Sequence, residues 1–385
     1  MSARCDVLVL GVGGMGAAAL AHLASRGLSV IGVEQDRVPS ERGSSVGETR
    51  VIRKAYAEDP RYVPLLERAY VLWRALEAES GEALFVRTGC LNIGPPGHPA
   101  IAGVLASVAR HGLPHQHLQA DELRARFALE PAAGDEGIFE EDAGFLRVEA
   151  CTRAHARRAQ SCGAELRTRT PVCALDVTAG GVRATLADGE TLSADRAVVA
   201  AGPWLGSAPA LREVARALRL TVERQVQLWF RPTEPARARP PTLPAFIHFT
   251  PRGAFYGIPP DDAPGLEPAV KVCRHHGGEA TTADALDRAV RPDDEETVRA
   301  YLRAHLPAAA GPLVRSRVCM YTNTPDEHFV VGALARWPHV VVLGGFSGHG
   351  YKMASVIGEI AADLLTEGRC AFDLTMFDPA RFHTS

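Results

Sequence analysis

A glycine pattern in the first 34 residues restricts the fold more than any other feature of the chain. The run Asp6-Val-Leu-Val-Leu-Gly11-Val-Gly13-Gly-Met-Gly16 is apolar and then glycine-rich. A segment of small residues follows it and ends near Gly27, and a second apolar run, Val30-Ile-Gly-Val-Glu34, comes next. This order predicts a strand, a helix and a parallel second strand, which together form a βαβ unit.

Each residue type in this pattern suits the binding of a dinucleotide. Gly11 permits a tight turn, Gly13 lets backbone N–H groups approach a pyrophosphate at a helix N-terminus, and Gly16 permits close packing of the helix on the strand. Glu34 is placed to accept a hydrogen bond from a ribose hydroxyl. A purely structural turn is the simpler alternative, but the flanking strand and helix favour a dinucleotide site. The acid fits FAD and NAD equally well, so this unit leaves the choice between them open.

Two later segments bear on that choice. One is Arg317-Val-Cys-Met-Tyr-Thr-Asn-Thr-Pro-Asp-Glu-His-Phe329, and the other is Gly344-Gly-Phe-Ser-Gly-His-Gly350-Tyr-Lys352. Together with the N-terminal glycines they resemble the monomeric sarcosine oxidase and N-methyltryptophan oxidase family, FAD-dependent amine oxidoreductases of the D-amino acid oxidase superfamily. The resemblance runs almost to the C-terminus. It implies FAD as the cofactor, carried as a thioether between Cys319 and the flavin 8α carbon.

Length and composition are those of an ordinary globular enzyme. The 385 residues suggest about two to three domains, and hydrophobic residues make up 46% of the chain. A formal charge of -3 favours neither nucleic acid nor a membrane surface as a partner. No apolar run approaches the roughly 18 residues of a membrane-spanning helix. Because the first strand begins by Asp6, we expect no signal peptide and a cytoplasmic location.

The eight cysteines show no CxxC pair and no spacing typical of metal ligands, so we expect no metal site. We predict that seven of them are reduced, small and buried. Cys319 is the exception, because a thiolate there is suited to attack the electron-poor ring of a flavin.

We predict an α/β chain (α+β overall) in which a Rossmann-like FAD-binding domain is interleaved with a substrate domain built on a mixed or antiparallel β-sheet. The expected FAD-binding domain comprises residues 1–80, 146–206 and 312–385, and the substrate domain comprises 81–145 and 207–311. An amphipathic helix is expected around residues 65–76 and a closing helix at 355–365. Strands are expected at residues 90–93, 144–146, 246–249, 255–258, 269–273 and 340–343, and a meander at 165–202.

The resemblance also implies roles for charged residues. Arg53 and Lys352 match the positions that clamp a substrate carboxylate, for which Arg offers a planar fork and Lys a point charge. The spacing of Arg50 and Arg53 predicts that both lie on one side of a helical turn, with Arg50 near the flavin. Lys271 matches the family's oxygen-activating lysine, and a buried ammonium stabilises negative charge where water is excluded.

Further site residues follow from the same resemblance. Tyr256 and His275 match positions that line the substrate pocket, although side chains of these types at strand ends are often simply packed. His349 lies in the glycine loop at a helix start, where N–H groups would face the pyrimidine end of reduced flavin. The remaining expected cofactor contacts are Ser44, Thr49, Val172, Gly202, Gly348 and Gly350.

The chain departs from the family pattern at two places. Ser45-Val46 stands where the family carries two histidines, which bears on flavin tuning or on the covalent linkage. The stretch 259–268 has more polar and proline residues than the family pattern leads us to expect, which could reshape the mouth of the pocket.

The implied function is a monomeric oxidase with two small-molecule partners, an amino acid and O2. It converts a secondary or N-methyl α-amino acid to an imine and reduces O2 to hydrogen peroxide. Oxidation of a cyclic imino acid, of the pipecolate or proline type, is a competing hypothesis, as is an FAD dehydrogenase with another electron acceptor. A flavin-binding protein without turnover is disfavoured by the charges at Arg53, Lys271 and Lys352. A nicotinamide dehydrogenase would leave the Cys319 and Lys352 segments without a function.

Overall fold

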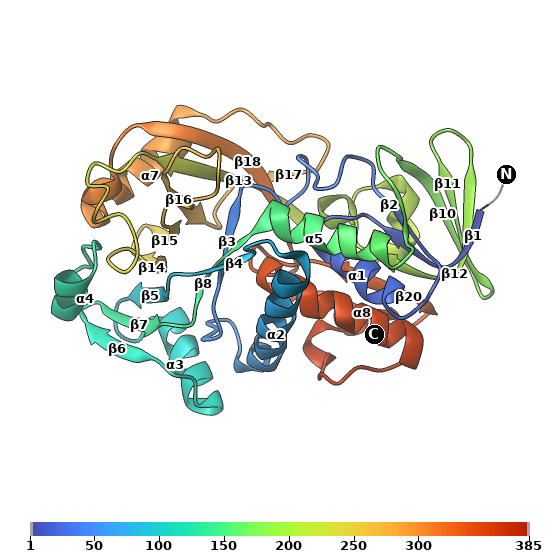
Figure 1. Cartoon of the computed structure of the whole chain (residues 1–385), viewed down its shortest axis with the longest axis horizontal. Helices are drawn as coiled ribbons and strands as arrows, with labels where there is room; N and C mark the ends of the chain where they lie inside the picture. The colour runs from blue at the N-terminus through green and yellow to red at the C-terminus, as the bar shows by residue number, and fades with distance from the viewer. Residues whose placement is uncertain (1–2, 383–385) are drawn as a thin grey trace.

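The computed structural model describes residues 3–382 and has two lobes that lie side by side (Figure 1). Strands β1, β2, β12 and β20 lie in one lobe, and strands β5, β7 and β13 to β16 lie in the other. Each lobe is built on a sheet of its own. This arrangement confirms the expected mixture of helices with mixed and antiparallel sheets.

The first sheet has a parallel centre made by the N-terminal βαβ unit. β1 (Ala3–Leu10) pairs in parallel with β2 (Val30–Val33) on one side and with β12 (Thr191–Val199) on the other. β20 (Trp337–Gly344) continues the parallel order beside the second half of β12. The remaining strands of this sheet are β9 (Glu165–Arg167), β10 (Val172–Thr178), β11 (Gly181–Leu186) and β19 (Val330–Leu334).

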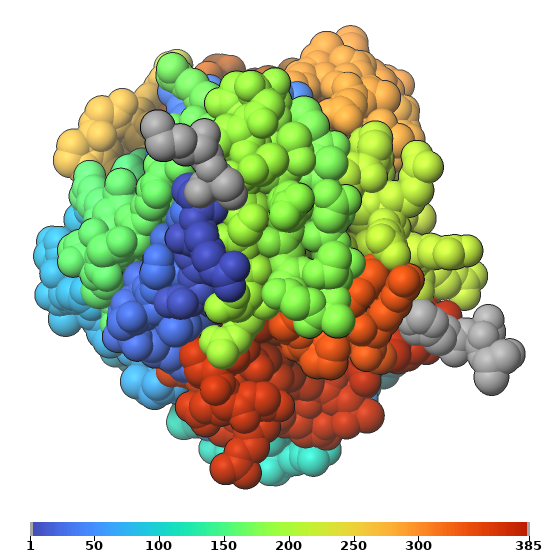
Figure 2. Space-filling view, turned by 90° about the vertical axis from the view of Figure 1, so that its right-hand side faces the viewer, coloured from blue at the N-terminus to red at the C-terminus, as the bar shows by residue number. Residues whose placement is uncertain are grey.

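Helix α1 (Gly14–Ala24) packs against both α5 (Val148–Ser161) and α8 (Ala354–Glu367). Its small residues allow close approach: a Cβ added at Gly358 would meet Ala18 at 2.5 Å. Figure 2 shows the result, with the N-terminal, green central and red C-terminal segments packed together on one end of the molecule. The first lobe is thus assembled from distant parts of the chain.

The second sheet has the order β17-β13-β16-β15-β14-β5-β7-β6, with β18 also paired to β13. Only β5 and β14 are parallel among its pairs between described residues. Its strands are β5 (Cys90–Gly94), β6 (Gln116–Gln119), β7 (Glu136–Glu140), β13 (Thr221–Phe230), β14 (Ala245–Thr250), β15 (Gly253–Ile258), β16 (Val270–His275), β17 (Ala280–Thr281) and β18 (Leu313–Asn323).

A small antiparallel sheet joins the lobes. It consists of β3 (Thr49–Ile52), β8 (Gly144–Arg147) and β4 (Phe85–Arg87). The other helices are α2 (Val63–Ser80), α3 (Pro99–His111), α4 (Ala120–Arg126), α6 (Arg212–Ala215) and α7 (Pro292–His305).

The topology places β18 in the second sheet, although residues 312–385 are expected in the FAD-binding domain. The domain boundaries themselves stay a prediction. Within residues 3–382, no helix combines the length and apolar character that crossing a membrane requires.

Two local expectations are wrong. Arg50 lies in β3 and Arg53 directly follows it, so no helical turn carries them; pairing of β3 with β8 imposes the extended backbone. Cys162 and Cys173 are exposed and Cys370 is half-buried, although all three were expected to be buried. Cys162 follows the last turn of α5, and Cys173 lies at the irregular start of the edge strand β10.

Candidate active site

A cavity runs along the carboxyl ends of the parallel strands β1, β2, β12 and β20. Its empty volume is about 1480 Å³ including the solvent-open mouth. Ligands of open α/β sheets bind at this edge. Of the expected site residues, those that line it are Gly11, Gly13, Glu34, Ser44, Arg50, Val172, Gly202, Gly348 and Gly350.

The three glycines of the first turn differ in what surrounds them. Gly11 has φ +86°, and a Cβ there would lie 2.5 Å from the Ala200 carbonyl oxygen. A Cβ at Gly16 would lie 1.8 Å from the Gly11 oxygen, so Gly16 permits the helix to touch the turn. Gly13 caps α1, and a Cβ there would meet nothing within 4 Å. The N-terminus of α1 therefore faces open space, as a pyrophosphate site requires.

Glu34 closes the same end of the cavity. Its carboxylate accepts hydrogen bonds from the backbone N–H groups of Val12 (2.8 Å) and Asp36 (3.0 Å). Burial raises the pKa of this carboxyl. The two N–H donors fix Glu34 at the edge of the cavity, where it is available to a ribose.

The loop before β3 is held by two cations. Arg50 donates to the carbonyl oxygens of Ser44 (3.0 Å) and Thr49 (2.9 Å). Lys271 donates to the carbonyl oxygens of Gly47 (2.7 Å) and Thr49 (3.0 Å). Burial, with a contribution from the charge of Arg50, lowers the pKa of Lys271 to about 7. A titratable ammonium thus lies behind the loop, close to the cavity.

Cys319 lies on β18 and is 1% exposed, beside Met320 and Tyr321 of the cavity wall. Its Sγ accepts a hydrogen bond from Gln227 Nε2 at 3.2 Å. The Tyr321 hydroxyl hydrogen-bonds to His275 Nδ1 at 3.0 Å. The rings of His275 and Tyr256 are perpendicular, with centroids 6.2 Å apart. The second sheet therefore brings Tyr321, His275 and Tyr256 together, and Cys319 lies two positions before Tyr321 on β18.

Arg53 and Lys352 come together around the ring of Tyr56, although they are about 300 positions apart in sequence. The Arg53 Cζ lies 5.2 Å from the ring centroid and the Lys352 Nζ lies 5.0 Å from it. Both residues are 5% exposed. Lys352 Nζ donates to the His349 carbonyl oxygen at 2.6 Å and lies 3.4 Å from the Tyr56 hydroxyl. The two cations thus form a buried positive cluster.

The charge of this cluster is only partly balanced. The carboxylate of Glu58 lies 3.8 Å from Arg53 Nη2, longer than a hydrogen bond. Arg53 Nε is buried and has no hydrogen-bond partner among the described residues. Burial, followed by the charge of Arg53, lowers the pKa of Lys352 to about 7. An anion entering this cluster would meet one guanidinium edge with free donor capacity.

The His349 side chain turns away from the cavity, whereas the neighbouring Gly348 and Gly350 line it. Its Nε2–H donates to the Glu327 carbonyl oxygen (3.0 Å), and its Nδ1 accepts from the Tyr56 hydroxyl (2.5 Å). Burial lowers the pKa of His349 to about 4, so the ring is neutral near pH 7. This neutral ring braces Tyr56 beneath the two cations.

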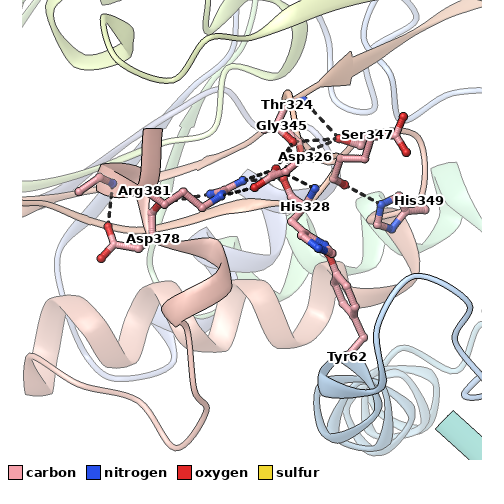
Figure 3. A network of polar contacts seen from close by, with 11 residues as sticks. Tyr62, Thr324, Asp326, His328, Gly345, Ser347, His349, Asp378 and Arg381 are labelled. Atoms are coloured by element: carbon pink, nitrogen blue, oxygen red, sulfur yellow. Dashed lines mark hydrogen bonds and ion pairs between the residues drawn. The ribbon is translucent and has the colours of Figure 1, made fainter. Parts of the chain in front are cut away.

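The turn between β18 and β19 supports the glycine loop (Figure 3). Arg381 binds the Asp326 carboxylate at 2.8 and 3.0 Å, and Asp326 accepts from the backbone N–H of His328. Ser347 Oγ accepts from the Thr324 N–H at 3.3 Å. These bonds fix the turn that carries the oxygen to which His349 donates.

Comparison with known proteins decides the class of this site. The model of the FAD-dependent oxidoreductase family matches residues 6–364, which is most of the chain. The chain belongs to this family. It is an FAD-dependent oxidoreductase, and the cavity has the glycine cradle, helix N-terminus and acid that such a cofactor requires.

The relatives of this oxidoreductase match along its whole length. Monomeric sarcosine oxidase of Streptomyces avermitilis is 38% identical over 385 residues, covering 99% of this chain and 98% of the relative. N-methyl-L-tryptophan oxidase of Citrobacter koseri is 34% identical, covering 98% and 99%. Among solved structures, NikD, described as an unusual amino acid oxidase essential for nikkomycin biosynthesis, matches with a TM-score of 0.85 at 26% identity, covering 98% of each chain.

The sequence does not mark every residue of this oxidoreductase's site. Glu58, Tyr56 and Gln227 had no motif to mark them, since each reaches the site through contacts with distant segments. For Glu58, the only signal in the sequence is its position five residues after Arg53. Of the expected cofactor residues, Gly16, Thr49, Cys319 and His349 are not among the residues that line the cavity, although each neighbours a residue in sequence that does or contacts one.

Proposed function

We propose that this protein oxidises a secondary or N-methyl α-amino acid, with Arg53 and Lys352 holding the substrate carboxylate. The observation that carries this proposal is the incompletely balanced buried cluster, in which the Glu58 carboxylate lies 3.8 Å from Arg53 Nη2, and no carboxylate of the described residues forms an ion pair with Lys352. Buried charges are costly unless paired, so the cluster favours an anionic ligand. An amino acid carries such an anion, because its carboxylate is bonded to the α carbon, next to the amine nitrogen.

The relatives support an N-methyl amino acid. The two named above act on sarcosine, which is N-methylglycine, and on N-methyl-L-tryptophan. Their substrates share the carboxylate and the N-methyl group and differ in the side chain. We therefore propose that the substrate of this chain also has a carboxylate and an N-methyl group.

For the cofactor, we propose that the N-terminus of α1 at Gly13 holds the pyrophosphate and that Glu34 holds a ribose. Ser44, Thr49, Val172, Gly202, the Gly348–Gly350 loop and His349 complete the proposed contacts. When bound, FAD accepts a hydride equivalent from the substrate carbon next to nitrogen and passes the electrons to O2. Cys319 is the proposed point of covalent attachment.

The protein's own part is positioning and charge. Tyr256 and His275 wall the substrate site and exclude water. Lys271 places positive charge where negative charge develops as O2 is reduced, and Arg50 adds a second cation beside it. We further propose a monomer with an amino acid and O2 as its partners, and a cytoplasmic location.

The overall reaction balances as N-methyl amino acid, O2 and water giving the amino acid, formaldehyde and hydrogen peroxide. A second candidate is oxidation of a cyclic imino acid, whose ring imine is retained. The likeness to NikD, described as an unusual amino acid oxidase, fits an amino acid substrate of either kind. Transfer of electrons to an acceptor other than O2 is a third.

Product analysis separates these candidates. The purified protein is given N-methylglycine, N-methyltryptophan, proline and pipecolate in air, and peroxide and formaldehyde are both measured. We expect equal amounts of the two products from an N-methyl substrate. Peroxide without formaldehyde, from the cyclic compounds alone, would favour the second candidate. Turnover of any substrate only with an artificial acceptor would identify a dehydrogenase.

A further inference from the structure

Gln227 joins Cys319 to the loop before β3. Its Nε2 lies 3.2 Å from Cys319 Sγ and 3.4 Å from the Val46 carbonyl oxygen. Gln227 is 2% exposed and lies on β13, the strand paired with β18. One side-chain amide therefore contacts both the sulfur and the loop.

The loop approaches this amide as closely as its backbone allows. A Cβ added at Gly47 would lie 1.6 Å from Gln227 Oε1, and Gly47 has φ +92°. Gln227 Oε1 itself is buried without a hydrogen-bond partner among the described residues. Both ends of the amide are thus confined, which fixes the direction of its N–H groups.

We propose that Gln227 is a positioning residue for covalent attachment of the cofactor to Cys319. This inference rests on the proposed thioether. Forming that bond removes the thiol proton and one hydrogen of the 8α methyl carbon and joins sulfur to carbon. The two electrons and two protons released reduce one O2 to hydrogen peroxide.

The reason lies in the charge that develops on sulfur. As the thiol proton leaves, sulfur gains negative charge, and an N–H donor at 3.2 Å stabilises it. The same donor fixes the rotamer of Cys319, so the sulfur is held in one direction. A side chain of the same length without a donor would keep the packing and lose both effects.

The test compares Gln227→Met with Gln225→Met. Gln225 is a neighbour on the same strand, 5% exposed, and its Nε2 contacts Glu223 rather than sulfur. Each protein is prepared without cofactor and incubated with FAD in air. Covalent incorporation is followed by the flavin fluorescence that stays with the acid-denatured chain on a gel, and noncovalent binding by absorbance of the native protein.

We expect Gln227→Met to bind FAD but to incorporate it covalently at least about tenfold more slowly than the wild type. Noncovalent FAD binding by Gln227→Met should stay at the wild-type level, so that only the covalent step is slowed. A general packing defect would weaken both steps together. Gln225→Met should match the wild type.

Incorporation by Gln227→Met at the wild-type rate would overturn the inference while leaving the thioether intact. A wild-type chain that releases all its flavin on denaturation would overturn both the thioether and this role for Gln227, and leave the proposed amine oxidation standing. If Gln227→Met fails to fold, Gln227→Leu gives the same test, since leucine is also apolar and lacks the N–H donor.

Discussion

Replacing Arg53 with methionine should weaken substrate binding far more than it weakens the fold. A hydrogen bond to a charged group contributes about 1.5–3 kcal/mol, and Arg53 offers a carboxylate two donors of which Nε is without a partner. Lys352 remains in the variant, so we place the total loss at about 2–4 kcal/mol. That corresponds to an increase in Kd of about 30- to 900-fold.

The stability of Arg53→Met should change little. Its nearest carboxylate, Glu58, is 3.8 Å away, so the free protein loses a weak ion pair together with the cost of burying a cation. The matched control is Lys54→Met. Lys54 is the next residue, is partly exposed and pairs with Asp142 at 3.2 Å.

The assay mixes the flavin-containing protein with N-methylglycine in the absence of O2 and follows the loss of flavin absorbance. The dependence of the rate on substrate concentration gives Kd separately from the limiting rate. Arg53→Met should show the larger Kd, and Lys54→Met should stay within about threefold of the wild type. Equal losses in both variants, or a Kd for Arg53→Met near the wild-type value, would refute the carboxylate clamp.

Three other outcomes follow from the geometry. Lys271→Met should leave anaerobic reduction of the flavin largely unchanged and slow its reoxidation by O2 at least about tenfold, because the buried positive charge is lost. Stopped-flow absorbance measures both rates, and unchanged reoxidation would refute a role for Lys271 in the reaction with O2. Binding of isobutyrate, a carboxylate with no titrating amine, should weaken as the pH rises above about 7, since free Lys352, with its pKa lowered to about 7, loses its proton; a flat titration would show that Lys352 takes no part. Gly13→Ala should leave the unfolding temperature of the cofactor-free protein unchanged, because a Cβ there meets nothing within 4 Å. The same methyl group should weaken FAD binding about tenfold or more by occupying the space proposed for the pyrophosphate. An unchanged FAD affinity would show that the pyrophosphate does not bind at Gly13.

Local sequence predicted the cofactor cradle because the relevant constraints are local. Gly11 needs its positive φ, and Gly16 lies directly on the turn that Gly11 makes. The closing helix and the strand that ends at Gly344 also lie where their apolar periodicity predicted. In each of these elements, the local residues themselves determine the backbone conformation.

The substrate side was harder to predict because its contacts are long-range. The spacing of Arg50 and Arg53 predicted a helical turn, but pairing of β3 with β8, about 95 positions away, imposed a strand. Gln227 lies 92 positions from the sulfur it contacts. No periodicity or motif carries that information, so resemblance to a family pointed to the clamp and only the structure revealed Glu58 and Gln227.

Adding N-methylglycine to the purified yellow protein without O2, and then admitting air, tests the proposed amine oxidation in one experiment. We expect loss of the flavin absorbance near about 450 nm, its return in air, and one hydrogen peroxide for each substrate oxidised. Absorbance that no N-methyl or cyclic amino acid diminishes, at any attainable concentration, would contradict it.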